Sequence, residues 1–173
     1  MNARASQIAF VVALIILSGC VSTSHDSRWR IAKEDSFTVE IPTWLRKRKI
    51  QPVDSNCGQY GSPRMRLNFD EVSFLLYPPE KAKALHEKFA GAYQTSAQDE
   101  TRPEFIKRVG ERYAHFTVGR DKKWVEWGYP GEYAVEVHIP DLRGGYLSLY
   151  VTYCDPADTD TALHIAKSIK FKK

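Results

Sequence analysis

The feature that most constrains the fold is a strict alternation of apolar and polar residues on both sides of a glycine-containing link at 140–145. A period of two is typical of β-strands that bury one face, and two such strands joined by a short link predict an antiparallel hairpin. Matching the apolar faces requires an even register, with Ile139 opposite Leu147. The apolar positions are Tyr133, Val135, Val137 and Ile139 in one strand, and Leu147, Leu149, Val151 and Tyr153 in the other.

The rest of the chain adds further strands and two helices. We expect a hairpin at 29–41, one bent strand or a tight hairpin at 65–76, strands at 105–118 and 125–127, and an irregular segment at 50–63. A helix is expected to open at Pro78-Pro79 and a second at Asp155-Pro156, with Asp155 as its N-cap. The predicted fold class is α+β: an antiparallel β-sheet with two main helices packed on one face, forming a two-layer sandwich.

The N-terminus has the features of an export signal. Arg4 precedes ten apolar residues, 8–17, which are too few to span a bilayer core of about 30 Å as a helix. Leu17-Ser18-Gly19-Cys20 then resembles the lipobox of bacterial lipoproteins. The resemblance implies that Cys20 carries a diacylglycerol anchor after cleavage before it. Val21 follows in place of the aspartate that retains enterobacterial lipoproteins in the inner membrane, which favours the outer membrane with the domain facing the periplasm.

These signals divide the chain into three parts: a signal peptide at 1–19, a flexible polar tether at 20–27 and a single periplasmic α+β domain at 28–173. Phe37-Thr-Val-Glu-Ile-Pro-Thr-Trp44 resembles the opening strand and Pro-x-Trp corner of PsbP/DcrB-like domains. Gly145-Tyr-Leu-Ser-Leu149 and Ala166-Lys-Ser-Ile-Lys-Phe171 resemble their closing elements. The resemblance implies a non-enzymatic accessory or binding domain.

The charge balance argues against nucleic-acid binding. The chain has 25 basic and 21 acidic residues, and removal of the signal takes away Arg4 alone, which leaves a net charge of +3. Nucleic-acid-binding domains need a concentrated basic stripe and a higher pI.

Two cysteines remain once Cys20 is lipidated. Because the periplasm oxidises thiols, Cys57 and Cys154 are predicted to form a disulfide. Free thiols or a Cys–His pair stay as the alternative. Neither His138 nor His164 has a zinc-ligand spacing to either thiol, so no metal and no cofactor are predicted.

One constellation on the predicted hairpin invites a catalytic interpretation. The even register places His138 opposite Ser148 and Glu136 opposite Tyr150 on the outer side of the sheet. Ser, His and Glu together have the composition of a hydrolase triad. The chain has no Gly-x-Ser-x-Gly elbow, however, and a flat strand offers no oxyanion hole. We therefore predict no catalytic residues.

A partner or membrane surface is predicted from charge and aromatic content. Arg46, Lys47, Arg48 and Lys49 form the densest basic run, which is either a solvated loop or a contact for anionic lipid headgroups. In a strand at 125–127, Trp127 would share the inward face with Val125, and Trp124 would be exposed. Trp124 and Tyr129 would then form a binding tip.

Taken together, the sequence predicts a membrane-anchored lipoprotein whose non-catalytic periplasmic domain binds a protein partner in the envelope. Two alternatives stay open. A toxin-immunity lipoprotein would present a basic surface to an acidic effector, and a small periplasmic enzyme would hold clustered titratable groups in a deep pocket.

Overall fold

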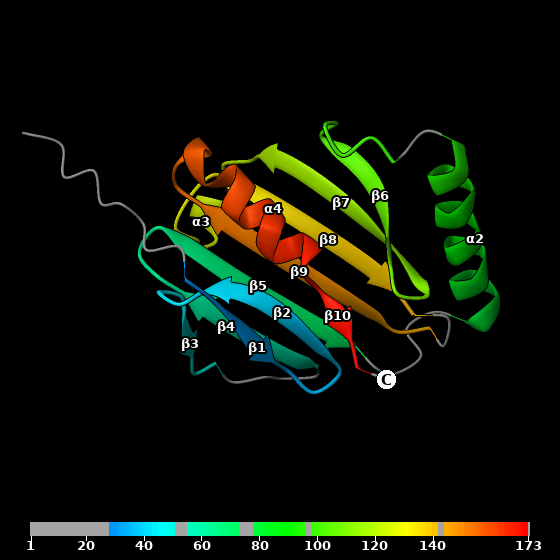
Figure 1. Ribbon diagram of the computed structural model, residues 1–173, viewed down its shortest axis with the longest axis horizontal. Helices are drawn as coiled ribbons and strands as arrows, with labels where there is room; N and C mark the ends of the chain where they lie inside the picture. The colour runs from blue at the N-terminus through cyan, green and yellow to red at the C-terminus, as the bar shows by residue number, and fades with distance from the viewer. Residues whose placement is uncertain (1–27, 51–54, 73–77, 96–97, 142–143, 173) are drawn as a thin grey trace, which may run out of the picture.

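The computed structural model describes residues 28–50, 55–72, 78–95, 98–141 and 144–172. Within these residues the chain forms one large and one small antiparallel sheet (Figure 1). The large sheet has the strand order β3-β4-β5-β9-β8-β7-β6 and the small sheet the order β1-β2-β10. The strands are β1 (Trp29–Lys33), β2 (Phe37–Pro42), β3 (Arg46–Arg48), β4 (Asn56–Gly61), β5 (Met65–Val72), β6 (Glu104–Val109), β7 (Arg112–Arg120), β8 (Tyr133–Pro140), β9 (Tyr146–Tyr153) and β10 (Lys170–Phe171).

The helical elements are α2 (Pro79–Thr95), α3 (Lys123–Glu126), the 3-10 turn η1 (Pro156–Asp158) and α4 (Thr159–Lys167). The expected helix starts are confirmed. The Asp155 side chain accepts a hydrogen bond from the Ala157 amide at 2.9 Å, as an N-cap does. No helix in the described part of the chain is long and apolar enough to span a membrane.

The main core lies between the large sheet and a second layer made of the small sheet and α4. The predicted hairpin is confirmed, including the pairing of Ile139 with Leu147. The small sheet packs on the same face, where Phe37 meets Phe69 edge-on at 5.1 Å between ring centroids. The shared core comprises, among others, Phe37, Val39, Ile41, Leu67, Phe69, Phe116, Val135, Val137, Leu149, Val151, Ile165 and Ala166.

The two longer helices cover opposite faces of the large sheet, so the prediction of two helices on one face is wrong. Helix α4 packs on the core face, and the Tyr153 hydroxyl of β9 shares a hydrogen bond with Thr159 Oγ1 at 3.1 Å. Helix α2 packs on the outer face, where its Phe89 ring lies 5.7 Å from His115. The α+β class and the antiparallel sheet are confirmed, but the fold is richer in strand than predicted.

Several segments differ from their predicted local structure. The segment expected to be irregular contains β4, and the basic run expected in a loop forms the edge strand β3. Gly58 makes the β4 pairing possible, because a Cβ at that position would lie 2.2 Å from the Phe69 ring. The segment expected as a strand at 125–127 is instead the single turn of helix α3 and its C-cap.

A buried carboxylate joins the two sheets. Glu34, in the turn between β1 and β2, accepts hydrogen bonds from the Tyr60 hydroxyl and from Lys47 Nζ, the latter at 3.0 and 3.1 Å. Only 8% of Glu34 is exposed, so these two partners offset the loss of its hydration. Arg30 adds to the joint by donating to the Leu45 carbonyl at 2.8 Å. The Glu34 joint thus fixes the β1–β2 turn against strands β3 and β4.

From the Glu34 joint we expect the free energy of unfolding of the domain to fall at alkaline pH. Burial, followed by the hydrogen bond to Glu34 and its charge, raises the pKa of Tyr60 well above its ordinary value. A raised pKa means that the contribution of Tyr60 to stability is complete below about pH 10, the pKa of an unfolded tyrosine, and falls as the pH rises above it. Tyr60→Phe should cost about 1–3 kcal/mol at pH 7 and reduce the alkaline loss, measured by urea unfolding at several pH values. A variant with the pH dependence of the wild type would contradict this role.

Candidate functional surface

Cys57 and Cys154 do not form the predicted disulfide. Both are free thiols. Cys57 lies opposite Asp70, which in turn lies opposite Ser148 of β9. Cys154 is six residues after Ser148 and directly follows the end of β9. At about 3.3 Å per residue the thiols are roughly 20 Å apart along the strands, whereas a disulfide needs Cα atoms within about 7 Å. The prediction was based only on the oxidising compartment and on an expected loop at Cys57. It is wrong because Cys57 belongs to strand β4, whose register holds it away from Cys154.

The basic run is divided by strand alternation. Lys47 points to the core side and pairs with the buried Glu34, so it is a structural residue. Arg46 and Arg48 lie on the outer face, and Lys49 follows the strand as an exposed residue. Arg66 of β5 lies opposite Gly61, as does Arg46 of β3. The structure therefore brings a third arginine, distant in sequence, beside the two from the run.

Helix α3 supplies aromatic side chains to this same face. The predicted exposures are reversed: Trp124 is buried at 4% exposure, and Trp127 is 64% exposed. The reason is that this segment is a helical turn whose Trp124 ring packs on Tyr150 of the sheet, while Trp127 at the C-cap lies edge-on against the Trp124 ring at 5.6 Å. Trp124 packs between Tyr129 and Tyr150, at ring distances of 5.3 and 5.6 Å.

Arg66 connects the aromatic and basic groups. Its Nη1 donates to the Gly128 carbonyl at 2.9 Å, and its guanidinium lies 5.3 Å from the centre of the Tyr129 ring. Burial, followed by the nearby charge of Arg48, lowers the pKa of Arg66, and Tyr129 opposes this effect. We call this region the arginine–aromatic surface, which consists of Arg46, Arg48, Arg66, Val125, Trp127 and Tyr129.

A row of reactive side chains crosses the middle of the outer face. Backbone pairing aligns one residue from each of five neighbouring strands, and this polar row is Cys57, Asp70, Ser148, His138 and His115. The predicted pairing of His138 with Ser148 is confirmed, and His138 Nδ1 and Ser148 Oγ share a hydrogen bond at 3.1 Å. A shallow cavity of about 230 Å³ opens over His115, His138 and Ser148, with Glu136 and Tyr150 at its side.

The polar row contains parts of a hydrolytic site but no assembled triad among the described residues. Burial, followed by the neighbouring His115, lowers the pKa of His138, so its ring is neutral at pH 7. Among the residues that the structure describes, no carboxylate hydrogen-bonds to His138 to orient it as a triad acid does. Burial raises the pKa of Glu136, whose nearest basic partner is Lys123 at 4.0 Å. Asp70 Oδ1, on the far side of Ser148, is buried and has no hydrogen-bond partner within the described part of the chain.

The described residues hold no group of three or more His, Cys, Asp or Glu side chains arranged to bind a metal ion. Sequence reasoning missed Arg66 and Trp127 as members of the outer face. It did place His115 there, because Ala114 and Phe116 mark the inward positions of the strand. No local pattern indicates that Arg66 lies beside the residues of α3.

Comparison with known proteins gives the chain no family. No protein-family model matches the sequence, and no characterised protein is significantly similar to it.

Proposed function

We propose that this protein is a lipoprotein anchored by Cys20 in the bacterial outer membrane, whose periplasmic domain binds an acidic protein partner without catalysis. The arginine–aromatic surface carries the proposal. None of Arg46, Arg48 and Arg66 forms a salt bridge within the described residues, and the exposed Trp127 precedes Gly128, whose carbonyl Arg66 contacts. A partner of opposite charge would relieve the repulsion that Arg66 experiences from Arg48.

The residue types favour a protein partner over a lipid surface. Arginine, tryptophan and tyrosine are the residues most enriched in the energetic centres of protein interfaces. The rigid support matters as well, because Arg66 is already fixed by Gly128 and Tyr129 and loses little side-chain freedom on binding. The likeness of 37–44, 145–149 and 166–171 to PsbP/DcrB-like domains points in the same direction, to a binding domain.

The same surface would serve a toxin-immunity lipoprotein, which differs only in the identity of the acidic partner. A small periplasmic enzyme would instead act through the polar row. Its support is the contact between His138 and Ser148, and the missing orienting carboxylate weighs against it.

The test is site-specific photocrosslinking in intact cells. A photoreactive amino acid at position 127 should link the full chain to one envelope protein, at a segment rich in Asp and Glu. Arg46→Glu with Arg48→Glu should reduce that product at least about tenfold, because truncating or reversing a central charge costs about 2 kcal/mol or more. The matched control is Lys83→Glu with Lys88→Glu on the exposed side of α2, which should leave the product unchanged.

Equal crosslinking in the Arg46/Arg48 double variant, or a product that maps to a basic segment, would overturn the proposal. Crosslinking to lipid alone would assign the surface to the membrane. A partner secreted by competing cells would identify the protein as an immunity factor.

A further inference from the structure

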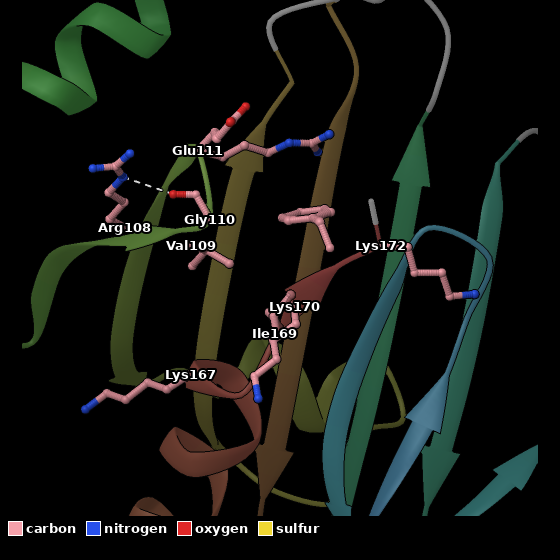
Figure 2. A pocket seen from close by; sticks show the side chains of 10 residues that line it. Arg108, Val109, Gly110, Glu111, Lys167, Ile169, Lys170 and Lys172 are labelled. Carbon is pink, nitrogen blue, oxygen red and sulfur yellow. Dashed lines mark hydrogen bonds between the residues drawn. The ribbon is translucent and has the colours of Figure 1, made fainter.

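A second surface, on the opposite side of the fold from α3, is hollowed and strongly basic. A cavity of about 570 Å³ lies between the turn that joins β6 to β7 and the chain from the end of α4 through β10. Figure 2 shows Arg108 and Glu111 on the turn, and Lys167, Lys170 and Lys172 on the other segment. The cavity thus brings together two segments that are about sixty residues apart in sequence. Its positively charged lining residues are Arg108, Arg112, Lys167, Lys170 and Lys172.

The floor of the cavity is apolar. Val109 and Ile169, one from each segment, lie among the charged side chains in Figure 2. Phe171 also lines the cavity. Val109 and Ile169 are 6% and 3% exposed, so the floor belongs to the packed edge of the core. An apolar floor inside a ring of cations suits a ligand with an apolar body and acidic groups at its rim.

Two of the cations are held in place by the protein itself. Arg112 pairs with Asp141 at 3.0 Å, and its guanidinium lies 4.0 Å from the centre of the Phe171 ring. Lys167 pairs with Glu100 at 2.6 Å. These contacts fix the position of the charges before any ligand arrives, which reduces the entropy lost on binding.

The remaining cations lack a described acidic partner. Lys170 and Lys172 form no salt bridge within the described residues, and Arg108 Nε donates to the Gly110 carbonyl at 2.9 Å. Gly110 has φ of +64°, a left-handed conformation that lets the chain reverse there and favours glycine. Counting Glu111, Asp141 and Glu100, five positive charges face three negative ones.

We infer that this cavity binds an anionic amphiphile: a molecule with a planar or aliphatic apolar body and at least one phosphate, sulfate or carboxylate group. The apolar body lies over Val109 and Ile169 beside Phe171, and the flexible side chains of Lys170 and Lys172 turn toward the acidic group when it binds. A lipid headgroup region and a soluble aryl phosphate share this chemistry. The site is separate from the arginine–aromatic surface and does not depend on the partner proposed for it.

The test uses the full chain in phosphatidylcholine nanodiscs and 1-naphthyl phosphate as the probe, with binding measured by calorimetry. The probe should bind more tightly than inorganic phosphate or neutral 1-naphthyl glucoside. Lys170→Gln with Lys172→Gln should weaken binding by about tenfold, because two favourable charge contacts are lost. The control pair Lys33→Gln with Lys122→Gln removes the same charge at exposed positions outside the cavity and should leave binding unchanged.

Hydrogen exchange followed by mass spectrometry then locates the ligand and its source. The probe should slow exchange in peptides that cover 105–113 and 167–172. The same protection in nanodiscs containing phosphatidylglycerol, lost in the Lys170/Lys172 variant, would identify the ligand as a membrane lipid. Protection by the probe alone would identify a soluble ligand. Inorganic phosphate binding as tightly as the probe, or equal binding by the Lys170/Lys172 variant, would overturn the inference.

Discussion

Gly131→Ala should destabilise the domain by about 3 kcal/mol or more, enough to unfold much of it at ordinary temperatures. A Cβ at this position would lie 2.0 Å from the Tyr153 carbonyl oxygen and 2.6 Å from the Cys154 Cα. Both neighbours are backbone atoms at the end of the central strand β9, so no side chain can rotate away. Relief would require β9 or the chain before β8 to move, which would disturb the register of Tyr133 with Tyr153.

The same chain supplies a matched control. Gly91 lies inside α2, where a Cβ would meet nothing within 4 Å, so Gly91→Ala tests the same chemical change without the clash. It should be neutral or stabilise by up to about 1 kcal/mol, because alanine is the better helix former. Urea unfolding followed by tryptophan fluorescence measures both variants. Similar stabilities for the two would contradict the close approach at Gly131.

Cys20→Ser should abolish incorporation of a fatty-acid analogue, and the variant should no longer be anchored to the membrane. The physical reason is that each buried methylene contributes about 0.8 kcal/mol to membrane affinity, and serine provides no thiol for the diacylglycerol. The lipobox resemblance at 17–20 is the basis of this prediction, and it rests on the lipoprotein proposal above.

The other cysteines serve as controls for the label. Cys57→Ser and Cys154→Ser keep the lipobox intact and should incorporate the analogue as the wild type does. If the wild-type chain incorporates no analogue, or if incorporation is lost in Cys57→Ser or Cys154→Ser, the assignment of Cys20 as the anchor is wrong. Envelope fractionation with and without Cys20 then tests whether the outer membrane is the destination.

Much of the sheet could be predicted, because its strands bury one face and expose the other. Strands β8 and β9 alternate without interruption, and their register followed from matching the two faces. The pairing of His138 with Ser148 followed from the same argument. Strand β4 was missed because glycines and polar residues fill it, and its position depends on contact with Phe69, which lies eight or more residues away in sequence.

The candidate surface could be predicted only in part. The basic run and Tyr129 do lie on one face, but which members of the run are available depends on the pairing of Lys47 with Glu34. The reversed exposures of Trp124 and Trp127 have another cause. A segment of five residues with alternating apolar character fits either a strand or one helical turn, and the packing of Trp124 on Tyr150 selects the turn.

The placement of the helices could not be read from their own sequences. Helix α2 has an apolar face, yet nothing in it specifies which side of the sheet it covers. The side is determined by β7, whose outer residues Tyr113 and His115 carry large rings. These rings form a second, smaller contact layer with His86, Phe89 and Tyr93 of α2. The His86 ring is part of this layer.

The Glu34 joint also determines how the domain responds to mechanical tension. Strand β1 is the first described element of the chain and, among the described strands, pairs with β2 alone. A pull from the N-terminal side therefore loads the open end of that hairpin at Trp29 and Pro42. In this direction the hydrogen-bonded pairs break one after another, which requires little force. The joint lies at the closed end of the hairpin, where Glu34 is held by Lys47 and Tyr60 of the large sheet. Peeling would stop at the Glu34 joint. Strand β1 can therefore detach and extend under load while the main core stays folded.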